Sequence, residues 1–328
     1  MNILITGATG YIGTALAQYL HRDKGNHIRT FDTGYFGNAL TQYQDIDFVT
    51  GDIRDYKAVE RATAGMDAVI HLAGVVTDEL VDMNPTFGAE VNVGGTENII
   101  RAAKVCNVGR LIYASSSSVY GLAAEDGIPD EDAQPIPKTR YAAQKLDGER
   151  VVLLANTQQS IVTTAVRQAT AMGPAPRMRL DTVVNIFSKQ AFFDGKITPY
   201  GGDQYRSNVH VQDVVRFYRL LLTHEGVAGK PWNLTQGNFT VRDIAAAVQT
   251  VAEKEGINAV IETVDVEDNR SYRMDGSRAE KELDFKCVRT VADAVRDNFR
   301  WFQQGAIDPD DPIYRNNARM GDLVTKGE

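Results

Sequence analysis

The chain has 328 residues, of which 43% are hydrophobic and 24% are charged, a composition typical of a globular protein with a substantial core. Its 43 acidic residues outnumber its 35 lysines and arginines, and the resulting net charge of −8 disfavours attraction to nucleic acid or to an anionic membrane. Cys106 and Cys287 form no CxxC pair and the histidines have no metal-ligand spacing, so neither a disulfide scaffold nor a metal site is expected.

Short apolar runs alternate with amphipathic stretches through the first half of the chain. Apolar residues at i, i+3 and i+4 predict helices, and the runs between them predict strands. The predicted strands are 2–6, 27–31, 48–51, 68–72, 110–114 and 161–166, and the predicted helices are 11–23, 55–64, 84–106 and 139–157. Repeated strand–helix–strand units predict an α/β fold with a doubly wound parallel sheet, the Rossmann architecture.

This alternation stops after residue 167, where a Gly/Pro/Arg-rich stretch precedes a helical pattern at 180–194 and a mixed pattern at 239–303. We therefore expect a second, smaller mixed α/β lobe that binds the substrate. The expected boundaries are 1–167 for the Rossmann domain, with 209–235 returning to it, 168–208 and 236–305 for the lobe, and 306–328 for a polar tail. The tail has few apolar residues, so we expect it to be extended or mobile.

Neither a basic leader followed by an apolar segment nor a run of 18 apolar residues is found in the sequence. We therefore expect a cytoplasmic protein without a membrane span.

The first predicted strand leads directly into GATGYIG, which places Gly7, Gly10 and Gly13 at the start of a helix. Glycine permits a tight turn and a close backbone approach, and a helix N-terminus offers free N–H groups, so this loop can hold a pyrophosphate. Glycine turns after a first strand also serve packing alone, so the loop by itself leaves both interpretations open.

Asp32 ends the second strand about twenty residues beyond this loop, where an acid accepts hydrogen bonds from ribose hydroxyls and repels a 2′-phosphate. No basic residue follows at Thr33 or Gly34, which favours NAD over NADP. The alternative is that Asp32 only closes the turn before Gly34. After the third strand, Asp52 and Ile53 are expected to flank the adenine, unless Asp52 simply caps the next helix.

Tyr141 and Lys145 lie four residues apart, which puts them on one face of a helix. An adjacent ammonium, helped by the positive nicotinamide ring, would stabilise the phenolate and make the phenol a useful acid/base. The pair also occurs by chance on solvated helices. Here it follows the fifth strand, whose carboxyl end carries the serines 115–118, and ligands of such sheets sit at the carboxyl ends of strands. Ser116 or a neighbouring serine is therefore expected to hydrogen-bond the substrate oxygen that Tyr141 deprotonates.

Several of these motifs fall in the order and spacing of one family. GATGYIG, HLAG at 71–74, NVGGTENII at 92–100, SSSSVYG at 115–121 and YAAQK at 141–145 resemble those of the NAD-dependent sugar epimerase/dehydratase family of extended short-chain dehydrogenases/reductases. The resemblance covers roughly residues 1–303 and implies NAD as the cofactor. The cofactor contacts that we expect are Gly7, Gly10, Tyr11, Ile12, Gly13, Asp32, Asp52, Ile53, Leu72, Ala73, Gly74, Asn92, Ser115, Tyr141, Lys145 and Gln168.

The resemblance continues into the second lobe with one departure. RQATAMGP matches the family pattern R-x-x-N-x-x-GP, but Thr170 replaces the asparagine, which puts the usual substrate contact in doubt. YRSNVHVQD and DNRSYRMD resemble segments whose arginines grip the substrate diphosphate, although an exposed arginine is more often only a solvated charge. The substrate contacts that we expect are Ser116, Ser117, Thr170, Asn185, Arg206, Arg270 and Arg179, with Arg177 as an unassigned candidate.

The resemblance implies hydride transfer from C4 of a nucleotide-diphosphate sugar to NAD, with Tyr141, Lys145 and Ser116 as the catalytic residues. Family members that are 4,6-dehydratases carry Asp-Glu after the catalytic threonine, whereas this chain has Ser117 and Ser118. We therefore expect an epimerase that acts through a transient 4-keto sugar. A reductase or dehydrogenase, or less readily a dehydratase or decarboxylase, stays open. An alternative of another class is a non-catalytic dinucleotide sensor, which would typically lack the tyrosine or the lysine.

Two further expectations concern packing and assembly. His71 and His210 lie within predicted strands and are expected to be structural. Members of the family commonly pair two helices into a four-helix bundle, so the resemblance implies a homodimer through 92–106 and 141–155, although the apolar run in the second helix could equally pack within the domain.

Overall fold

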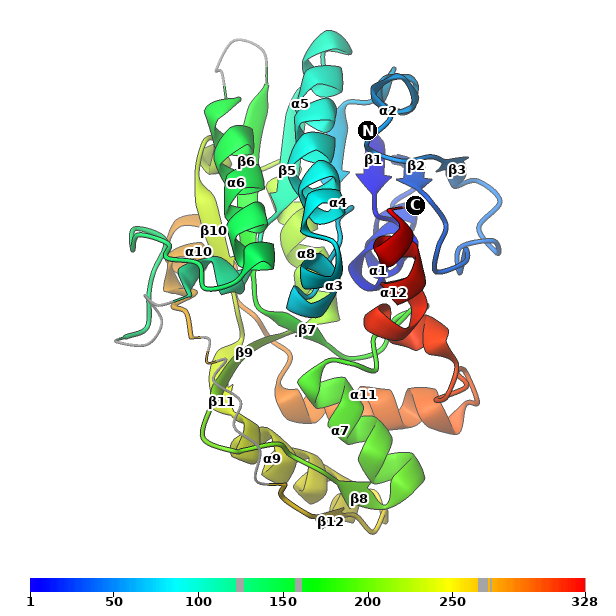
Figure 1. The fold of residues 1–328 in the computed structure, drawn as a ribbon, viewed down its shortest axis with the longest axis vertical. Coiled ribbons are helices and arrows are strands. Elements are labelled where there is room, and N and C mark those ends of the chain that lie inside the picture. The colour runs from blue at the N-terminus through cyan, green and yellow to red at the C-terminus, as the bar shows by residue number, and fades with distance from the viewer. Residues whose placement is uncertain (122–126, 157–160, 265–270, 272, 328) are drawn as a thin grey trace.

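The computed structural model describes residues 1–121, 127–156, 161–264, 271 and 273–327. Within these residues, one parallel sheet of seven strands has the order β10-β6-β5-β4-β1-β2-β3 (Figure 1). Its strands are β1 (Asn2–Thr6), β2 (His27–Asp32), β3 (Asp47–Thr50), β4 (Ala68–His71), β5 (Arg110–Ala114), β6 (Val162–Gln168) and β10 (Pro231–Leu234). The expected doubly wound Rossmann fold is confirmed.

Helices cover both faces of this sheet, so its inner strands are buried on both sides and read as continuous apolar runs. α1 and α8 pack together on one face, and α2, α5 and α6 on the other. The helices of the domain are α1 (Tyr11–His21), α2 (Tyr56–Thr63), α3 (Asp78–Met83), α4 (Pro85–Ala89), α5 (Gly95–Val105), α6 (Arg140–Leu154) and α8 (Val211–Leu221). The helix predicted over 84–106 runs without a break from Pro85 at the start of α4 to Val105 at the end of α5, with a π-helical turn at Glu90–Gly94 between the two.

A smaller mixed α/β lobe lies at the other end of the molecule (Figure 1). In the described part of the chain it contains a three-stranded sheet, β11-β9-β7, and the short pair β12-β8. Its elements are β7 (Thr170–Met172), α7 (Val183–Lys189), β8 (Lys196–Ile197), β9 (Tyr205–His210), β11 (Gly237–Thr240), α9 (Val241–Lys254), β12 (Val260–Ile261) and α11 (Val291–Gln303). Nearby, α10 (Ser277–Leu283) packs beside β10 of the large sheet.

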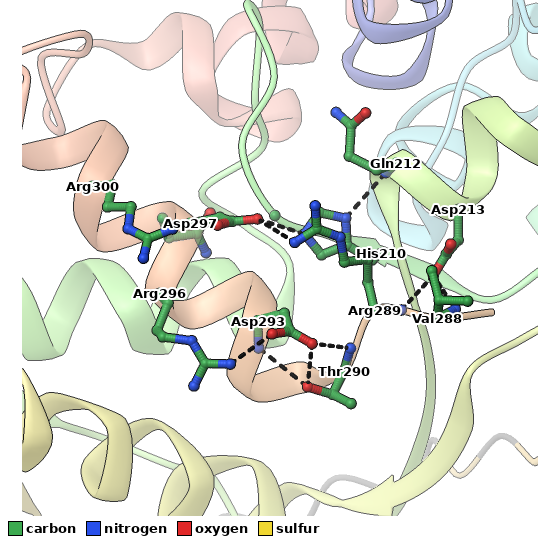
Figure 2. Close-up of polar contacts among 12 residues, drawn as sticks. His210, Gln212, Asp213, Val288, Arg289, Thr290, Asp293, Arg296, Asp297 and Arg300 are labelled. Atoms are coloured by element: carbon green, nitrogen blue, oxygen red, sulfur yellow. Dashed lines mark hydrogen bonds and ion pairs between the residues drawn. The ribbon is translucent and has the colours of Figure 1, made fainter.

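The chain returns to the Rossmann domain after β9. The predicted return at 209–235 begins slightly later, because β9 pairs with β7 and β11 of the small sheet, whereas α8 packs on α1 and β10 pairs with β6. Figure 2 shows how this junction is held. Asp213 at the start of α8 accepts hydrogen bonds from the amides of Val288 (3.0 Å) and Arg289 (2.9 Å), and His210 faces Asp297 of α11 at 3.5 Å. Through these contacts β9 and α8 dock against α11.

His71 is a buried part of the core. Its two ring nitrogens lie 2.7 Å from the Thr6 hydroxyl and 3.0 Å from the Thr96 hydroxyl. Burial lowers the pKa of His71 to about 3, so the ring is neutral at physiological pH. In the described ranges, no group of three or more His, Cys, Asp or Glu side chains is placed to hold a metal ion.

The expectation of an extended tail at 306–328 is wrong for its described end. A short 3₁₀ turn at Pro312–Tyr314 leads into α12 (Asn316–Lys326), which packs against α3. Met320 and Val324, one turn apart, are buried in the same apolar cluster as Leu80 and Val81. The helix forms because this single apolar stripe finds a partner in the fold, which a pattern of local sequence does not reveal.

Among the described residues, no helix combines the length and the hydropathy that crossing a bilayer requires.

Candidate active site

A cavity of about 680 Å³ lies at the carboxyl ends of β1, β2, β4, β5 and β6, with α7, β9 and α12 contributing to its other walls. The strand order reverses between β1 and β4, and such a switch point is where open α/β sheets bind their ligands. The volume is in the range of cofactor and substrate sites.

The three glycines of the first loop have different reasons to be glycine. Gly7 has φ of +73°, and a Cβ there would lie 2.6 Å from the Ala73 nitrogen. A Cβ at Gly13 would lie 2.2 Å from the Gly7 oxygen, so α1 can approach the loop only without one. Gly10 lines the cavity and caps α1 without a side chain, which leaves the first-turn N–H groups available to a phosphate. The loop therefore fits a dinucleotide pyrophosphate.

Asp32 joins this loop to the end of β2. Its carboxylate accepts hydrogen bonds from the Thr9 amide (3.0 Å), the Thr9 hydroxyl (2.7 Å) and the Gly34 amide (2.8 Å). It thus closes the turn before Gly34 and also lines the cavity. A carboxylate offers about four acceptor positions, so at least one stays open for a ribose hydroxyl. The two interpretations of Asp32 are compatible.

Asp52 and Ile53 line the cavity at the end of β3. Asp52 does not cap α2, because Asp55 accepts the hydrogen bonds from the first turn of that helix. Instead, both carboxylate oxygens of Asp52 accept from Arg54 at 2.7–2.9 Å. Ile53 is buried and gives the cavity an apolar wall.

Leu72, Ala73 and Gly74, which follow β4, also line the cavity. Asn92 does not line it. Its carboxamide is bonded to both backbone groups of Val75 (2.9 and 3.0 Å) and to Gln144 (3.0 Å), so it holds the 74–76 loop in place and does not face the cofactor site. The expectation of a direct cofactor contact at Asn92 is therefore replaced by an indirect role.

Gln168 at the end of β6 faces the cavity with an unsatisfied group. Its Oε1 is buried and has no hydrogen-bond partner among the residues that the structure describes. A buried polar atom of this kind costs free energy unless a ligand bonds it. Together with the glycine loop and Asp32, it fits a dinucleotide whose nicotinamide end lies near β4–β6.

Tyr141, Lys145 and Ser116 line the same cavity. Burial raises the pKa of Tyr141 to about 12, and a hydrogen bond with the Ser116 side chain is the largest opposing influence. The charge of Arg179 also lowers this pKa and that of Asp78 raises it. The serine and the phenol are thus one hydrogen-bonded unit beside two charged side chains.

Lys145 is itself desolvated. Only 4% of the residue is exposed, and its Nζ lies 4.2 Å from the centre of the Tyr113 ring. Burial lowers the pKa of Lys145 to about 7, against the opposing charge of Glu149. The lysine expected to lower the pKa of the phenol is therefore only partly protonated near neutral pH.

Glu149, one turn further along α6, is a centre of buried polar contacts that the sequence pattern does not reveal. It pairs with Arg167 of β6 at 2.7 Å and accepts the hydroxyl of Ser115 at 2.6 Å. Ser115 lines the cavity, but its hydroxyl is turned to this carboxylate. These bonds fix the ends of β5 and β6 relative to the helix that carries Tyr141.

The expected substrate contacts divide into three groups. Ser116, Ser117, Thr170, Arg179 and Arg206 line the cavity. Asn185 does not: it is fully buried, and its carboxamide bonds the Gly173 amide (2.9 Å), the Arg179 carbonyl (2.9 Å) and Asn298 (3.0 Å) behind the wall. Arg270 lies outside the described residues.

Tyr11 has a similar wall-building role. It lines the cavity, but its hydroxyl donates to the Gly173 carbonyl and accepts from Asn185 at 3.3 Å.

Sequence reasoning missed other lining residues. Thr77, Asp78 and Glu79 come from the start of α3; Gln190, Thr198, Tyr200 and Gln204 from the small lobe; and Asn316, Asn317 and Met320 from the C-terminal helix. The sequence contains a weak signal for the first group, because these residues follow β4, a strand that ends at the cavity. It contains no signal for the C-terminal residues, because no local sequence pattern indicates that they lie beside the end of β2.

Comparison with known proteins supports the family resemblance. Residues 3–235 match the model of the NAD dependent epimerase/dehydratase family. Short-chain dehydrogenase/reductase family 42E member 1 of Xenopus laevis is 30% identical over 72% of this chain and 63% of its own length, so the chain spans less than two thirds of that relative.

Two further similarities cover more of the compared protein. The N-acetyl-alpha-D-glucosaminyl-diphospho-ditrans,octacis-undecaprenol 4-epimerase of Escherichia coli O157:H7 is 29% identical over 77% of this chain and 73% of its own. Among solved structures, MoeE5 in complex with UDP-glucuronic acid and NAD has a TM-score of 0.80 at 25% identity, covering 93% of this chain and 100% of that one.

Proposed function

This chain belongs to the NAD dependent epimerase/dehydratase family and uses NAD, and from this premise we propose that it is a nucleotide-diphosphate-sugar epimerase acting at C4 of the sugar. One observation carries the proposal. The hydrogen-bonded pair Ser116–Tyr141 lies in the same cavity as the glycine loop, with serines and no carboxylic acid at positions 117 and 118.

The reaction needs a base for a sugar hydroxyl and a donor that holds the same oxygen. NAD, when bound, supplies the hydride acceptor and later the hydride donor. In its phenolate form, which the positive charge of protonated Lys145 favours, Tyr141 takes the C4 hydroxyl proton at its Oη, and Ser116 donates a hydrogen bond to the oxygen that becomes the 4-keto group. Turning the keto sugar over before reduction, with Tyr141 returning the proton, gives the C4 epimer.

Lys145 acts on Tyr141 through its protonation state. An amine whose pKa is about 7 can gain or lose a proton near neutral pH at little cost. Buried one turn from Tyr141 on α6, it supplies positive charge beside the phenol when protonated. Its Nζ is held against the Tyr113 ring, which fixes where that charge stands.

The cavity suits a sugar diphosphate although the protein as a whole is acidic. Arg179 and Arg206 both line it, and the first is held at 2.7 Å by Asp181. Guanidinium groups bind phosphate oxygens through several donors at once. The E. coli relative is a 4-epimerase of an N-acetylglucosaminyl-diphospho compound, and MoeE5 is in complex with UDP-glucuronic acid, so both involve a sugar diphosphate.

A second candidate is 4,6-dehydration, which one observation favours. Asp78 at the start of α3 lines the cavity, and its charge acts on the Tyr141 phenol, so a carboxyl group is present near the reacting centre. A dehydratase needs such a group to move protons at C5 and C6. The serines at 117 and 118 weigh against it.

The test is incubation of the NAD-loaded protein with UDP-glucose, UDP-glucuronic acid, UDP-N-acetylglucosamine, dTDP-glucose and GDP-mannose in D₂O, followed by proton NMR. An epimerase gives the C4 epimer with no deuterium in the sugar and no net use of NADH. Deuterium at C5 with loss of the C6 hydroxyl would mean dehydration, and stoichiometric NADH formation would mean net dehydrogenation of the sugar. A thermal-shift panel of the same compounds identifies the preferred nucleotide, because a bound ligand raises the melting temperature of the protein. If none of the compounds raises the melting temperature, the proposed substrate class is wrong.

Tyr141→Phe should lose nearly all turnover while NAD still binds, because only the proton-transfer group is removed. Tyr218→Phe is the matched control: this tyrosine is fully buried on α8, and its hydroxyl has no hydrogen-bond partner in the described residues. Turnover retained in Tyr141→Phe would contradict the assigned role.

We propose that the protein is a homodimer through α5 and α6. Val105 and Leu154, at the C-terminal ends of these helices, are 57% and 82% exposed and so offer apolar contact surface to a second copy of the chain. Light scattering after size-exclusion chromatography would show a mass of about twice 36.1 kDa, whereas a monomer at micromolar concentration would contradict the proposal.

A further inference from the structure

The C-terminal strap, residues 312–326, follows α11 of the small lobe and ends against α3 of the Rossmann domain (Figure 1). Three of its side chains, Asn316, Asn317 and Met320, line the cavity. They do so together with Asp32 and Ile53, the residues at the ends of β2 and β3 where a Rossmann sheet holds the adenosine half of a dinucleotide.

We propose that the C-terminal strap is the outer wall of the adenosine site and that NAD leaves only when the strap lifts. The strap would complete a pocket whose inner wall is Ile53, with the Met320 thioether against the adenine face. Methionine suits this position because it is apolar, adaptable and favourable beside an aromatic ring. The carboxamide of Asn317 keeps its donors for the purine or ribose, since its Oδ1 accepts from the protein.

The strap is fixed on the side of the small lobe by four hydrogen bonds. The guanidinium of Arg177 donates to the Ile313 carbonyl at 3.0 Å and to the Asn316 carboxamide at 2.7 Å. The Asp181 carboxylate accepts from the Asn316 amide at 2.9 Å, and the Leu180 amide donates to the carbonyl of Tyr314 at 2.8 Å.

Arg177 faces the cofactor site as well as the strap. It is buried and stacks 3.7 Å above the Phe36 ring, and burial lowers its pKa to about 9. The charge of Asp32 acts on it in the opposite direction, which places this arginine of the small lobe near the ribose-binding acid. One side chain therefore connects the lobe, the strap and the adenosine end of the site.

On the Rossmann side the strap meets the loops after β2 and β4. Arg319 donates to the Tyr35 carbonyl at 2.7 Å, and the Thr77 hydroxyl donates to Asn317 at 2.8 Å. Thr77 holds a φ of +113°, a costly conformation for a β-branched residue. Thr77 both lines the cavity and bonds the strap. The conformational free energy that its backbone costs is therefore spent at the contact between the strap and the Rossmann domain.

The inference holds whichever reaction the enzyme performs, because it concerns the cofactor alone. The strap is bonded to the small lobe on one side of the cavity and to the Rossmann domain on the other. The adenosine half of NAD can leave only after these contacts open. The dissociation rate of NAD therefore follows the fraction of molecules in which the strap is open. Loss of two anchors raises that population.

The test uses the double variant Asn317→Ala/Arg319→Ala. We expect NADH to dissociate about tenfold faster in stopped-flow fluorescence, and ADP to bind about tenfold more weakly by calorimetry, while nicotinamide mononucleotide binds as before. Arg315→Ala is the matched control, because the side chain of this arginine in the same segment bonds only the Asp310 carbonyl among the described residues, and its removal should leave both ligands' binding unchanged. Unchanged NADH dissociation, or an equal loss for nicotinamide mononucleotide, would overturn the proposal.

Hydrogen exchange on the unaltered protein gives an answer that does not depend on a variant folding. Amides of 316–326 should exchange more slowly with ADP than with nicotinamide mononucleotide at equal saturation. Equal protection by both ligands, or none by ADP, would show that the strap is not part of the adenosine site.

Discussion

Glu149→Gln removes a buried negative charge while keeping the size of the side chain. Glu149 and Arg167 are 2% and 5% exposed at the side chain, and the guanidinium is 2.7 Å from the carboxylate. Burial lowers the pKa of Arg167, but the hydrogen bonds and the negative charge of Glu149 raise it more. The pKa of Arg167 therefore lies above its usual range. Breaking such a pair from one side leaves a buried charge without its partner and costs about 3–5 kcal/mol.

That cost predicts a measurable change in melting temperature. An unfolding entropy of about 2.1 cal/mol/K per residue over 328 residues amounts to about 0.7 kcal/mol/K. The melting temperature of Glu149→Gln should therefore fall by about 4–7 °C, measured by circular dichroism at a fixed NAD concentration. Urea unfolding gives the free energy directly.

Asp147→Asn is the control on the same helix. Asp147 pairs with Arg150 at 3.3 Å, but both side chains are more than half exposed, so its loss should cost less than about 1 kcal/mol. Glu149→Met/Arg167→Met should be less destabilised than Glu149→Gln, because an apolar pair leaves no buried charge. A cost below about 1 kcal/mol for Glu149→Gln would refute the reasoning, since the pair would then behave as if in water.

Two other predictions concern the cofactor loop and the lysine. Gly13→Ala puts a Cβ 2.2 Å from the Gly7 oxygen and should weaken NAD binding at least tenfold by calorimetry, whereas Gly94→Ala, a helical glycine with open space around it, should bind NAD normally; equal binding by both would contradict the packing argument. The pKa of Lys145 is about 7 in the folded protein and 10.5 in the unfolded chain, so the unfolded chain binds more protons between these two pH values. The free energy of unfolding, measured by urea titration, should therefore rise with pH in this range, and Lys145→Met should flatten the rise. Identical pH slopes for the two proteins would contradict the prediction.

Local sequence contained enough information for the Rossmann half of the molecule. Buried parallel strands read as apolar runs, and the glycines sit where only glycine fits, so the order of elements and the residues at the strand ends could be predicted from pattern alone. The same pattern could not assign the exact partners of polar groups. Asn92 and Asn185 are bonded to protein atoms and not to the cavity, a choice made by residues far away in the chain.

What only tertiary structure decided is the closure of the site. Residues 312–326 look like a polar tail, because a short helix with one narrow apolar stripe has no stability of its own. The helix forms because Met320 and Val324 pack against Leu80 and Val81 of α3. This packing also brings Asn316 within hydrogen-bond distance of Arg177. Sequence thus determined the elements that bind a dinucleotide at the edge of the sheet. Contacts between distant segments, which carry no local signature, determined how that edge is covered and which charges face the Tyr141 phenol.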